Sequence, residues 1–171
     1  MLTTSNIQNA KTVGQLIAES NFDIVFGGGE NGIMGAVAQS AINYGASTTG
    51  IIPSFLLQKD LLHSGHSKKF NTELVRTETM HQRKKMMYDK SDGFLVLPGG
   101  IGTLDECFEV LTWCQLNQIK NKNVGIINFK GYWDPLINLI NHLIKEEFMG
   151  MNNLNYFEEI KNLKTLKIFL K

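Results

Sequence analysis

Residues 94–106 read FLVLPGGIGTLDE and indicate the fold more clearly than any other stretch. The first four residues are apolar, as in a buried strand, and the proline and glycines that follow favour a tight turn. A helix is expected from Leu104, with Asp105 and Glu106 in its first turn. The backbone N–H groups that begin such a helix have no partner inside it and carry partial positive charge. This turn therefore suits an anion, above all a phosphate.

The acidic residues beside this turn have competing interpretations. A carboxylate would repel a bound phosphate unless it acts on another part of the same ligand. Thr103 and Glu106 also have the spacing of a capping box, in which the glutamate reaches back to the helix start. Asp105 is expected to complement the helix dipole. Spacing alone leaves both the chemical and the structural role of Glu106 open.

Apolar segments alternate with helical patterns along the whole chain. We expect strands at 23–26, 47–52, 73–76, 93–97 and 124–128, and helices at 9–20, 33–44, 81–90, 104–117, 135–147 and 157–169. Residues 54–71 are ambiguous, with a partly helical pattern at 55–62. Uniformly apolar strands that alternate with helices predict an α/β fold, with a mainly parallel sheet covered on both faces.

Length and composition favour one globular domain over residues 1–171. Hydrophobic residues make up 43% and charged residues 19%, and the formal net charge is +1, which gives no electrostatic case for nucleic acid or an anionic membrane. The sequence has no signal peptide and no apolar run as long as a membrane span, so a cytoplasmic setting is expected. Cys107 and Cys114 are expected to be buried as small hydrophobic side chains.

Another glycine-rich turn, which comes first in the chain, follows the strand at 23–26. Residues 27–32 read GGGENG and match the GxGxxG pattern, but residues 51–54 read IIPS, where a dinucleotide site would need an acidic residue. Neither turn is followed by the lysine of a Walker loop, so both conventional sites are excluded. Because parallel strands end at the same edge of a sheet, the two glycine turns are expected to build one pocket.

The helix at 79–90 places an arginine on its apolar side. At 100° per residue Arg83 lies between Met86 and Met87, whereas Lys85 points away and is expected to be solvated. A guanidinium that faces inward needs an anionic partner, which could be a structural carboxylate, a ligand phosphate or a catalytic glutamate. Thr79 has the spacing of a capping residue for this helix.

Other polar residues give weaker signals. His63 and His66 could suggest a metal, but without a third ligand they are interpreted as a polar loop, and no metal site is expected. The chain contains no GxSxG motif, and neither cysteine has a nearby histidine in the sequence.

Four motifs occur in order: GGGxxGxMG at 27–35, MHxRK at 80–84, PGGxGTxxE at 98–106 and TWxQ at 112–115. This set resembles the LONELY GUY (LOG) family of cytokinin-activating phosphoribohydrolases, often labelled possible lysine decarboxylases. The resemblance implies a Rossmann-like three-layer α/β/α fold, a homodimer or higher homo-oligomer, and no metal or redox cofactor. The implied reaction hydrolyses the N-glycosidic bond of an AMP-like nucleoside 5′-monophosphate to a free base and ribose 5-phosphate.

By the same likeness, Arg83 and Glu106 are the catalytic pair. The implied substrate-binding residues are Gly28, Gly29, Gly32, Met34, Met80, Arg83, Lys84, Gly99, Gly100, Gly102, Thr103 and Glu106. Phosphate at the helix start would leave the ribose C1′ facing Glu106, whose carboxylate can stabilise an oxocarbenium-like sugar and activate water. The alternative is a non-catalytic carrier of a nucleotide or molybdenum cofactor in the same pocket. A pyridoxal-dependent decarboxylase is less favoured, because no lysine stands out.

Two further expectations concern the chain's start and its assembly. Members of the LOG family begin with a strand that carries Cys-Gly-Ser-Ser, and residues 1–5 leave no room for it, so this first strand is expected to be absent. The helix at 104–116 is apolar on more than one face. We expect one face to cover the sheet and the other to be buried in a dimer.

Overall fold

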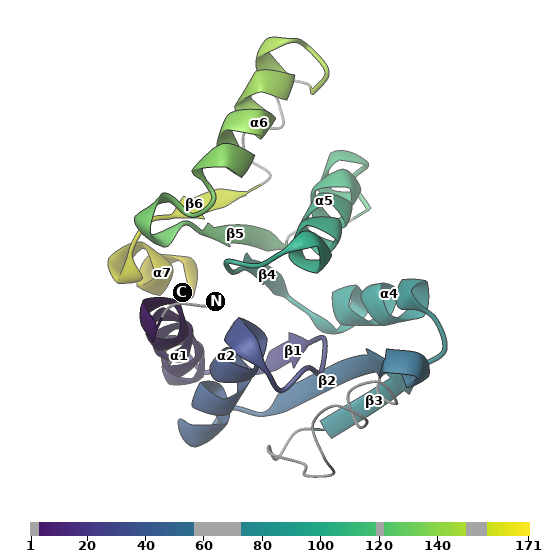
Figure 1. The fold of residues 1–171 in the computed structure, drawn as a ribbon, viewed down its shortest axis with the longest axis vertical. Coiled ribbons are helices and arrows are strands. Elements are labelled where there is room, and N and C mark those ends of the chain that lie inside the picture. Colours follow the sequence, from purple (N-terminus) through teal and green to yellow (C-terminus); the bar gives the residue numbers. More distant parts are fainter. Residues whose placement is uncertain (1–3, 57–72, 119–121, 150–156) are drawn as a thin grey trace. The chain divides into compact units, whose positions relative to one another are not determined.

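The computed structural model describes residues 4–56, 73–118, 122–149 and 157–171, in two compact units, Met1–Ser91 and Asp92–Lys171 (Figure 1). Each unit is an α/β arrangement around a three-stranded sheet, and each is described here by itself. All strand pairs in both sheets are parallel, as expected. A single domain over residues 1–171 stays a prediction.

The first unit has the strand order β1-β2-β3. Its elements are α1 (Thr4–Glu19), β1 (Ile24–Phe26), α2 (Gly32–Asn43), β2 (Thr48–Pro53), β3 (Glu73–Thr77) and α4 (Met80–Lys90). The central strand β2 is the best buried, with Ile51 0% and Ile52 3% exposed. Branched apolar side chains on this strand favour a pleated, fully covered position.

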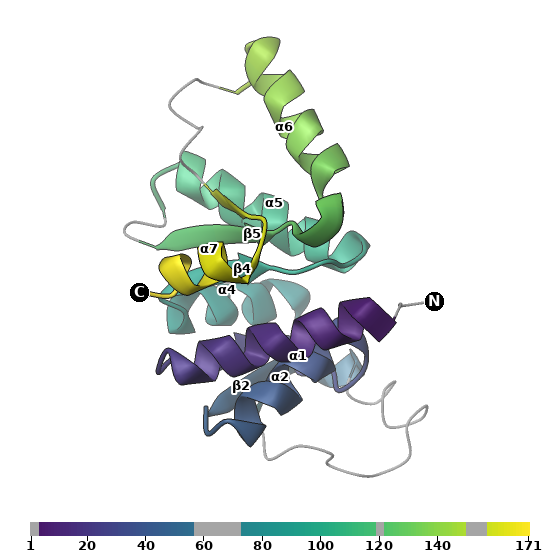
Figure 2. The same cartoon turned by 90° about the vertical axis from the view of Figure 1, so that its left-hand side faces the viewer.

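Helices α1 and α2 of this unit pack closely side by side (Figure 2). A Cβ atom at Gly14 of α1 would lie 2.3 Å from the carbonyl oxygen of Val37 in α2. The missing side chain therefore lets the two backbones approach each other. Ala38 and Ala41, both fully buried, keep the same surface of α2 narrow.

The second unit has the strand order β4-β5-β6. Its elements are β4 (Gly93–Val96), α5 (Ile101–Gln115), β5 (Asn123–Ile127), the 3₁₀ turn η1 (Phe129–Gly131), α6 (Asp134–Lys145), β6 (Glu158–Ile160) and α7 (Leu163–Phe169). Ile126 of β5, Ile160 of β6 and Leu166 of α7 are each 0% exposed and form the centre of its core.

The start of helix α5 differs from the expectation. The helix begins at Ile101, three residues early, so Gly102 and Thr103 lie within its first turn, not in the loop. Gly100 is the N-cap, and its carbonyl accepts the Leu104 N–H at 3.1 Å. The proposed Thr103–Glu106 capping box is therefore wrong, because glycine with an extended backbone already occupies the cap position.

The expected helix at 157–169 is also wrong in its first part. Residues Glu158–Ile160 form strand β6, in which Ile160 pairs with Ile127. The helix starts only after Asn162, whose side chain caps α7 by accepting the Thr165 N–H at 3.0 Å. Pairing with β5 buries Ile160 completely, and that tertiary gain overrides the local helical pattern.

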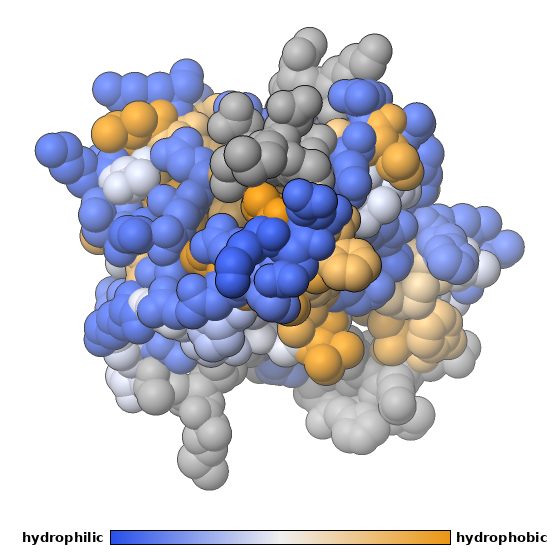
Figure 3. All heavy atoms as spheres, turned by 90° about the horizontal axis from the view of Figure 1, so that it is seen from above, coloured by the Kyte–Doolittle hydropathy of each residue, from blue (hydrophilic) through white to orange (hydrophobic). Residues whose placement is uncertain are grey.

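Several expectations fall on residues that the structure does not describe. The ambiguous segment from residue 57 onward and both His63 and His66 lie outside the described ranges. Within those ranges, no helix combines the length and the apolar character that a bilayer crossing requires. On the face drawn in Figure 3, hydrophobic side chains reach the surface in separate patches among hydrophilic ones.

Candidate functional site

Helix α4 turns Arg83 into the interior of the first unit. Thr79 and Gln82 form the expected capping box, with the Gln82 N–H donating to Thr79 Oγ1 at 3.2 Å. This cap fixes where the helix begins and so which residues face inward. Arg83 and Lys84 are each 8% exposed, which confirms the inward orientation predicted for the arginine. Lys85 is exposed, also as expected, and it pairs with Asp89.

The guanidinium of Arg83 lies between two backbone segments. Its Nε donates a hydrogen bond to the carbonyl oxygen of Ile51 in β2 at 3.1 Å. On the other side it lies against Gly27, directly after β1, where an added Cβ would be 1.9 Å from Nη2 and 3.0 Å from Cζ. No side chain other than hydrogen fits at position 27 while the guanidinium keeps this place. Gly27 is thus part of the arginine's binding surface.

The other residues of the glycine turn at 27–32 lie around the guanidinium of Arg83. Gly28 has a φ of +78°, a backbone conformation that glycine adopts without strain. The thioether of Met34 lies across the turn, because a Cβ at Gly29 would be 2.6 Å from its Cε and one at Gly27 would be 3.3 Å from its Sδ. The structure therefore gathers Gly27, Gly29, Met34 and Arg83. Gly32 and Met80 begin the two helices α2 and α4.

In the second unit, the turn after β4 leaves its backbone open. Thr103 folds back over Gly99, where an added Cβ would be 2.1 Å from the threonine Oγ1. At Gly100 and Gly102 an added Cβ would meet nothing within 4 Å among the described residues. The N–H groups that begin α5 have no partner inside the helix, so a ligand can approach them closely.

Glu106 lies one turn further along α5 and is half-buried. It follows Thr103 by three residues, which puts both side chains on the same face of the helix. Helical side chains lean toward the N-terminus, so the carboxylate leans toward the glycine turn. Since Gly100 caps the helix, the capping role no longer competes with a chemical role for Glu106.

The two predicted catalytic residues belong to different units. Arg83 lies in the first and Glu106 in the second. Because each unit is described by itself, the pairing of these side chains stays a prediction. The same holds for one pocket built from both glycine turns.

Sequence reasoning missed Tyr132, which contacts the second glycine turn. Its hydroxyl donates a hydrogen bond to the carbonyl oxygen of Gly99 at 2.8 Å. A usable signal was present, because Tyr132 follows strand β5 and the glycine turn follows the neighbouring parallel strand β4. Both segments must therefore lie at the carboxyl edge of this sheet.

The cysteines of α5 are buried thiols, as predicted. Cys107 is 1% and Cys114 9% exposed, and neither forms a disulfide. Burial raises the pKa of Cys107 to about 11 and also raises the pKa of Cys114. Both groups stay protonated near neutral pH, so neither is suited to act as a thiolate nucleophile.

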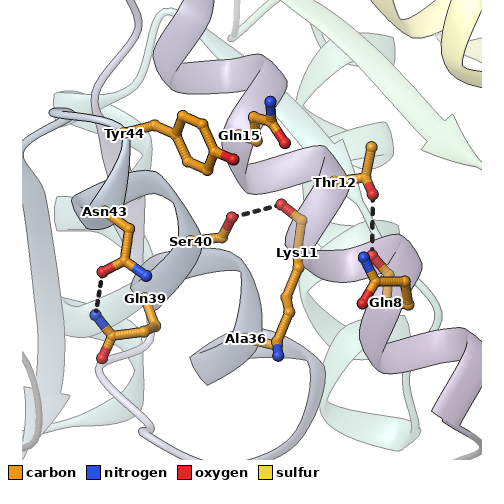
Figure 4. Close-up of a pocket in the computed structure, with 9 residues that line it drawn as sticks. All are labelled: Gln8, Lys11, Thr12, Gln15, Ala36, Gln39, Ser40, Asn43 and Tyr44. Carbon is orange, nitrogen blue, oxygen red and sulfur yellow. Dashed lines mark hydrogen bonds between the residues drawn. The ribbon is translucent and has the colours of Figure 1, made fainter.

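A groove between α1 and α2 is separate from these residues. It has a volume of about 280 Å³ and is lined by polar side chains such as Gln15, Gln39 and Asn43 (Figure 4). The Ser40 hydroxyl donates to the Lys11 carbonyl oxygen at 2.6 Å across it. None of the predicted site residues lines it. Within the described ranges, no group of three or more acidic, histidine or cysteine residues could hold a metal.

Solved structures of other proteins show the class of fold to which this chain belongs. The chain aligns with the molybdenum cofactor carrier protein of Chlamydomonas reinhardtii at a TM-score of 0.68 and 15% identity, covering 98% of this chain and 87% of the other. The molybdenum cofactor binding protein of Rippkaea orientalis gives a TM-score of 0.58 at 23% identity, covering 87% and 91%. These similarities show a Rossmann-type α/β fold.

Sequence comparison then gives the family. Residues 34–167 match the family described as possible lysine decarboxylase, and the chain belongs to it. The cytokinin riboside 5′-monophosphate phosphoribohydrolase of Rhodococcoides fascians is 40% identical over 143 residues, which are 83% of this chain and 69% of that protein. The enzyme LOG3 of Arabidopsis thaliana is also 40% identical, covering 85% of this chain and 66% of its own length.

The alignment covers less of some other relatives. A probable cytokinin riboside 5′-monophosphate phosphoribohydrolase of Oryza sativa, LOGL2, is 40% identical over 80% of this chain but only 54% of its own length. The chain thus spans between about half and two thirds of the length of several plant relatives that it matches.

Proposed function

We propose that this protein hydrolyses the N-glycosidic bond of a cytokinin-type nucleoside 5′-monophosphate. In this reaction the bond between C1′ and the base nitrogen breaks, water adds its oxygen to C1′, and the base leaves with a proton. The products are the free base and ribose 5-phosphate. The observation that carries the proposal is the 40% identity to phosphoribohydrolases named for this substrate, over more than four fifths of the chain.

The phosphate is assigned to the turn that begins α5. Gly100 and Gly102 supply backbone with room for an approaching oxygen, and Thr103, which folds back over Gly99, adds a hydroxyl at the same helix start. The partial positive charge of the helix N-terminus favours the dianion there. A polar N-cap residue could begin this helix equally well. The assignment therefore explains why two successive glycines stand before the helix instead.

Glu106 is assigned to the sugar. Cleavage of an N-glycoside develops positive charge on the ribose ring, and a carboxylate close to C1′ stabilises that charge. The same group can accept a proton from the attacking water, a contribution that is typically about 10²- to 10⁴-fold. Its position one turn from the phosphate-binding amides supports this role, because a 5′-phosphate and C1′ lie at opposite ends of one ribose.

Arg83 is assigned to the anionic part of the reacting site. Arg83 is almost completely buried, and the hydrogen bond from its Nε to the carbonyl oxygen of Ile51 fixes the plane of the guanidinium. A planar fork held in this way suits a phosphate or carboxylate better than a lysine would. The proposal therefore assigns Arg83 to an anionic group of the reacting site, and its pairing with Glu106 stays a prediction.

The direct test is product analysis with the purified chain. Incubation with isopentenyladenosine 5′-monophosphate is expected to release isopentenyladenine and ribose 5-phosphate in equal amounts, and AMP is expected to release adenine. The corresponding nucleosides, which lack the phosphate, serve as matched controls and should react far more slowly. Tight nucleotide binding without any base release would contradict hydrolysis and favour a carrier.

A homodimer is the proposed assembly. On α5 the exposed residues Ile101 (82%) and Phe108 (38%) share one face, which is turned about 100° or more from the buried Cys107 and Val110. Two large apolar side chains on one exposed helix face favour an interface between copies of the chain.

A further inference from the structure

The carbonyl oxygen of Gly99 is engaged by a side chain that is 33 residues distant in the sequence. The Tyr132 hydroxyl donates to it at 2.8 Å. A peptide unit is planar and trans, so the carbonyl of Gly99 and the N–H of Gly100 point in opposite directions. Holding the carbonyl therefore fixes the direction of the Gly100 N–H, one of the donors at the start of α5 that has no partner inside the helix.

Glycines on both sides of this peptide make such a restraint necessary. Gly99 and Gly100 have no side chains to limit their backbone angles, and an added Cβ at Gly100 would touch nothing among the described residues. A glycine pair loses much conformational freedom when it is ordered. A hydrogen bond from Tyr132 supplies part of the free energy that keeps the peptide in one orientation.

Tyr132 can act in this way because its own position is firmly held. The neighbouring Trp133 is 5% exposed, and its backbone N–H donates to Asn128 Oδ1 at 2.7 Å. Asn128 is itself buried, and its amide donates to Asp134 Oδ1 at 2.8 Å and to Glu159 Oε1 at 2.6 Å. The rings of Tyr132 and Trp133 meet edge to face, with their centroids 4.8 Å apart.

Tyr132 as a whole nevertheless remains 46% exposed. Its hydroxyl reaches the backbone of the glycine turn from the end of the neighbouring strand, while the asparagine network ties the base of the segment to β6 and α6. The hydrogen bonds of Asn128 thus hold the segment after β5 beside the peptide that joins Gly99 and Gly100.

We propose that Tyr132 is a positioning residue for the 5′-phosphate, an inference that rests on the proposed function. It orients the Gly100 N–H toward the bound phosphate through the Gly99 carbonyl, without touching the reacting atoms. It therefore contributes to the preference for a nucleoside monophosphate over the nucleoside, and contributes little to the chemical step at C1′.

The test uses Tyr132→Phe, which removes only the hydroxyl. The KM for AMP is expected to rise about five- to tenfold, as for the loss of one hydrogen bond, while kcat changes less than about twofold. The affinity for adenosine should not change. In the absence of ligand, hydrogen exchange in the peptide that covers residues 98–102 should become faster.

Tyr44→Phe is the matched control, because it removes a hydroxyl from an exposed tyrosine at the end of α2. It should leave the KM, the adenosine affinity and the exchange of residues 98–102 at wild-type values. If Tyr132→Phe weakens AMP and adenosine equally, or changes neither AMP affinity nor exchange, the inference is wrong. Failure of the proposed function is seen separately, in wild-type protein that neither binds nor hydrolyses AMP, and it would overturn the inference as well.

Discussion

Gly27, which has no side chain, leaves the space that the guanidinium of Arg83 occupies. The arginine's inward orientation followed from the sequence, because Met86 and Met87 flank it on the helix. Its neighbours could not be predicted in this way. The hydrogen bond to Ile51 and the contact with Gly27 join residues 32 and 56 positions away, and only the folded chain brings them together.

Replacing Gly27 by alanine should therefore act through Arg83. The new Cβ would lie 1.9 Å from Nη2, so the guanidinium must leave its place, and nucleotide affinity should fall about tenfold, as for a lost charge-assisted hydrogen bond. Calorimetric titration with AMP measures the change. In an Arg83→Ala background the same substitution should have no further effect on affinity.

Gly28→Ala is the contrasting variant for this comparison of Gly27→Ala with and without Arg83. Its φ of +78° strains any residue with a Cβ, so the free energy of unfolding should fall by about 1–3 kcal/mol whether or not Arg83 is present. If Gly27→Ala weakens AMP binding equally with and without Arg83, the assigned contact is not what makes Gly27 necessary.

The contact between Tyr132 and Gly99 could not be predicted from the residues around either of them. Nothing in the local pattern GYWDP marks its hydroxyl as a donor to Gly99. Only the order of the strands suggests it, since segments after neighbouring parallel strands share one edge of the sheet. Asn128, which holds the segment in place, is buried, whereas most asparagines are exposed.

At the scale of elements, strands and helices were predictable where burial and periodicity agree. Strand β2 and helix α4 match their expected positions within one residue. The prediction was wrong where a local rule competed with packing: Gly100 replaced Thr103 as the cap of α5, and Ile160 entered the sheet as part of β6. In both places the deciding interaction lies outside the segment's own pattern.

The buried thiol of Cys107 in helix α5 makes the free energy of unfolding depend on pH. Its pKa is about 11 in the folded chain, above the 9.0 of an exposed thiol. Between these values the unfolded chain loses the proton while the folded chain keeps it. The free energy of unfolding should therefore fall as pH rises from about 9 to 11, by at most about 1.4 kcal/mol per pH unit from this group.

Urea unfolding at several pH values measures this dependence. Cys107→Ala should lower stability at pH 8, because it leaves a small cavity, but should show a shallower decline above pH 9 than the wild type. An equal decline in both proteins would mean that other groups, not this thiol, account for the alkaline loss.

At the scale of the whole molecule, each unit supplies one half of the predicted chemistry. The first holds Arg83 and Met34 at a glycine turn, and the second holds Glu106 and Thr103 at another. The sequence predicted both halves from their glycines and helix starts. That both halves act on one ligand stays a prediction, because it depends on packing between elements far apart in the chain, which no local pattern contains.

The proposed dimer makes its own prediction at this scale. Phe108→Glu places a charge on the exposed face of α5, and its desolvation should convert the dimer to a monomer. Light scattering coupled to size-exclusion chromatography measures the mass. Ile168→Glu, at an exposed position on α7, is the matched control and should leave the mass unchanged. A monomeric wild-type chain would contradict the assembly.

The central claim is that one carboxylate of α5 acts at the sugar of a nucleoside monophosphate. The most direct measurement compares base release from isopentenyladenosine 5′-monophosphate by Glu106→Gln and by Asp105→Asn, a neighbouring exposed carboxylate on the same helix. Glu106→Gln should lose about 10²- to 10⁴-fold in kcat and still bind nucleotide, while Asp105→Asn should stay close to wild type. Wild-type turnover by Glu106→Gln would contradict the account.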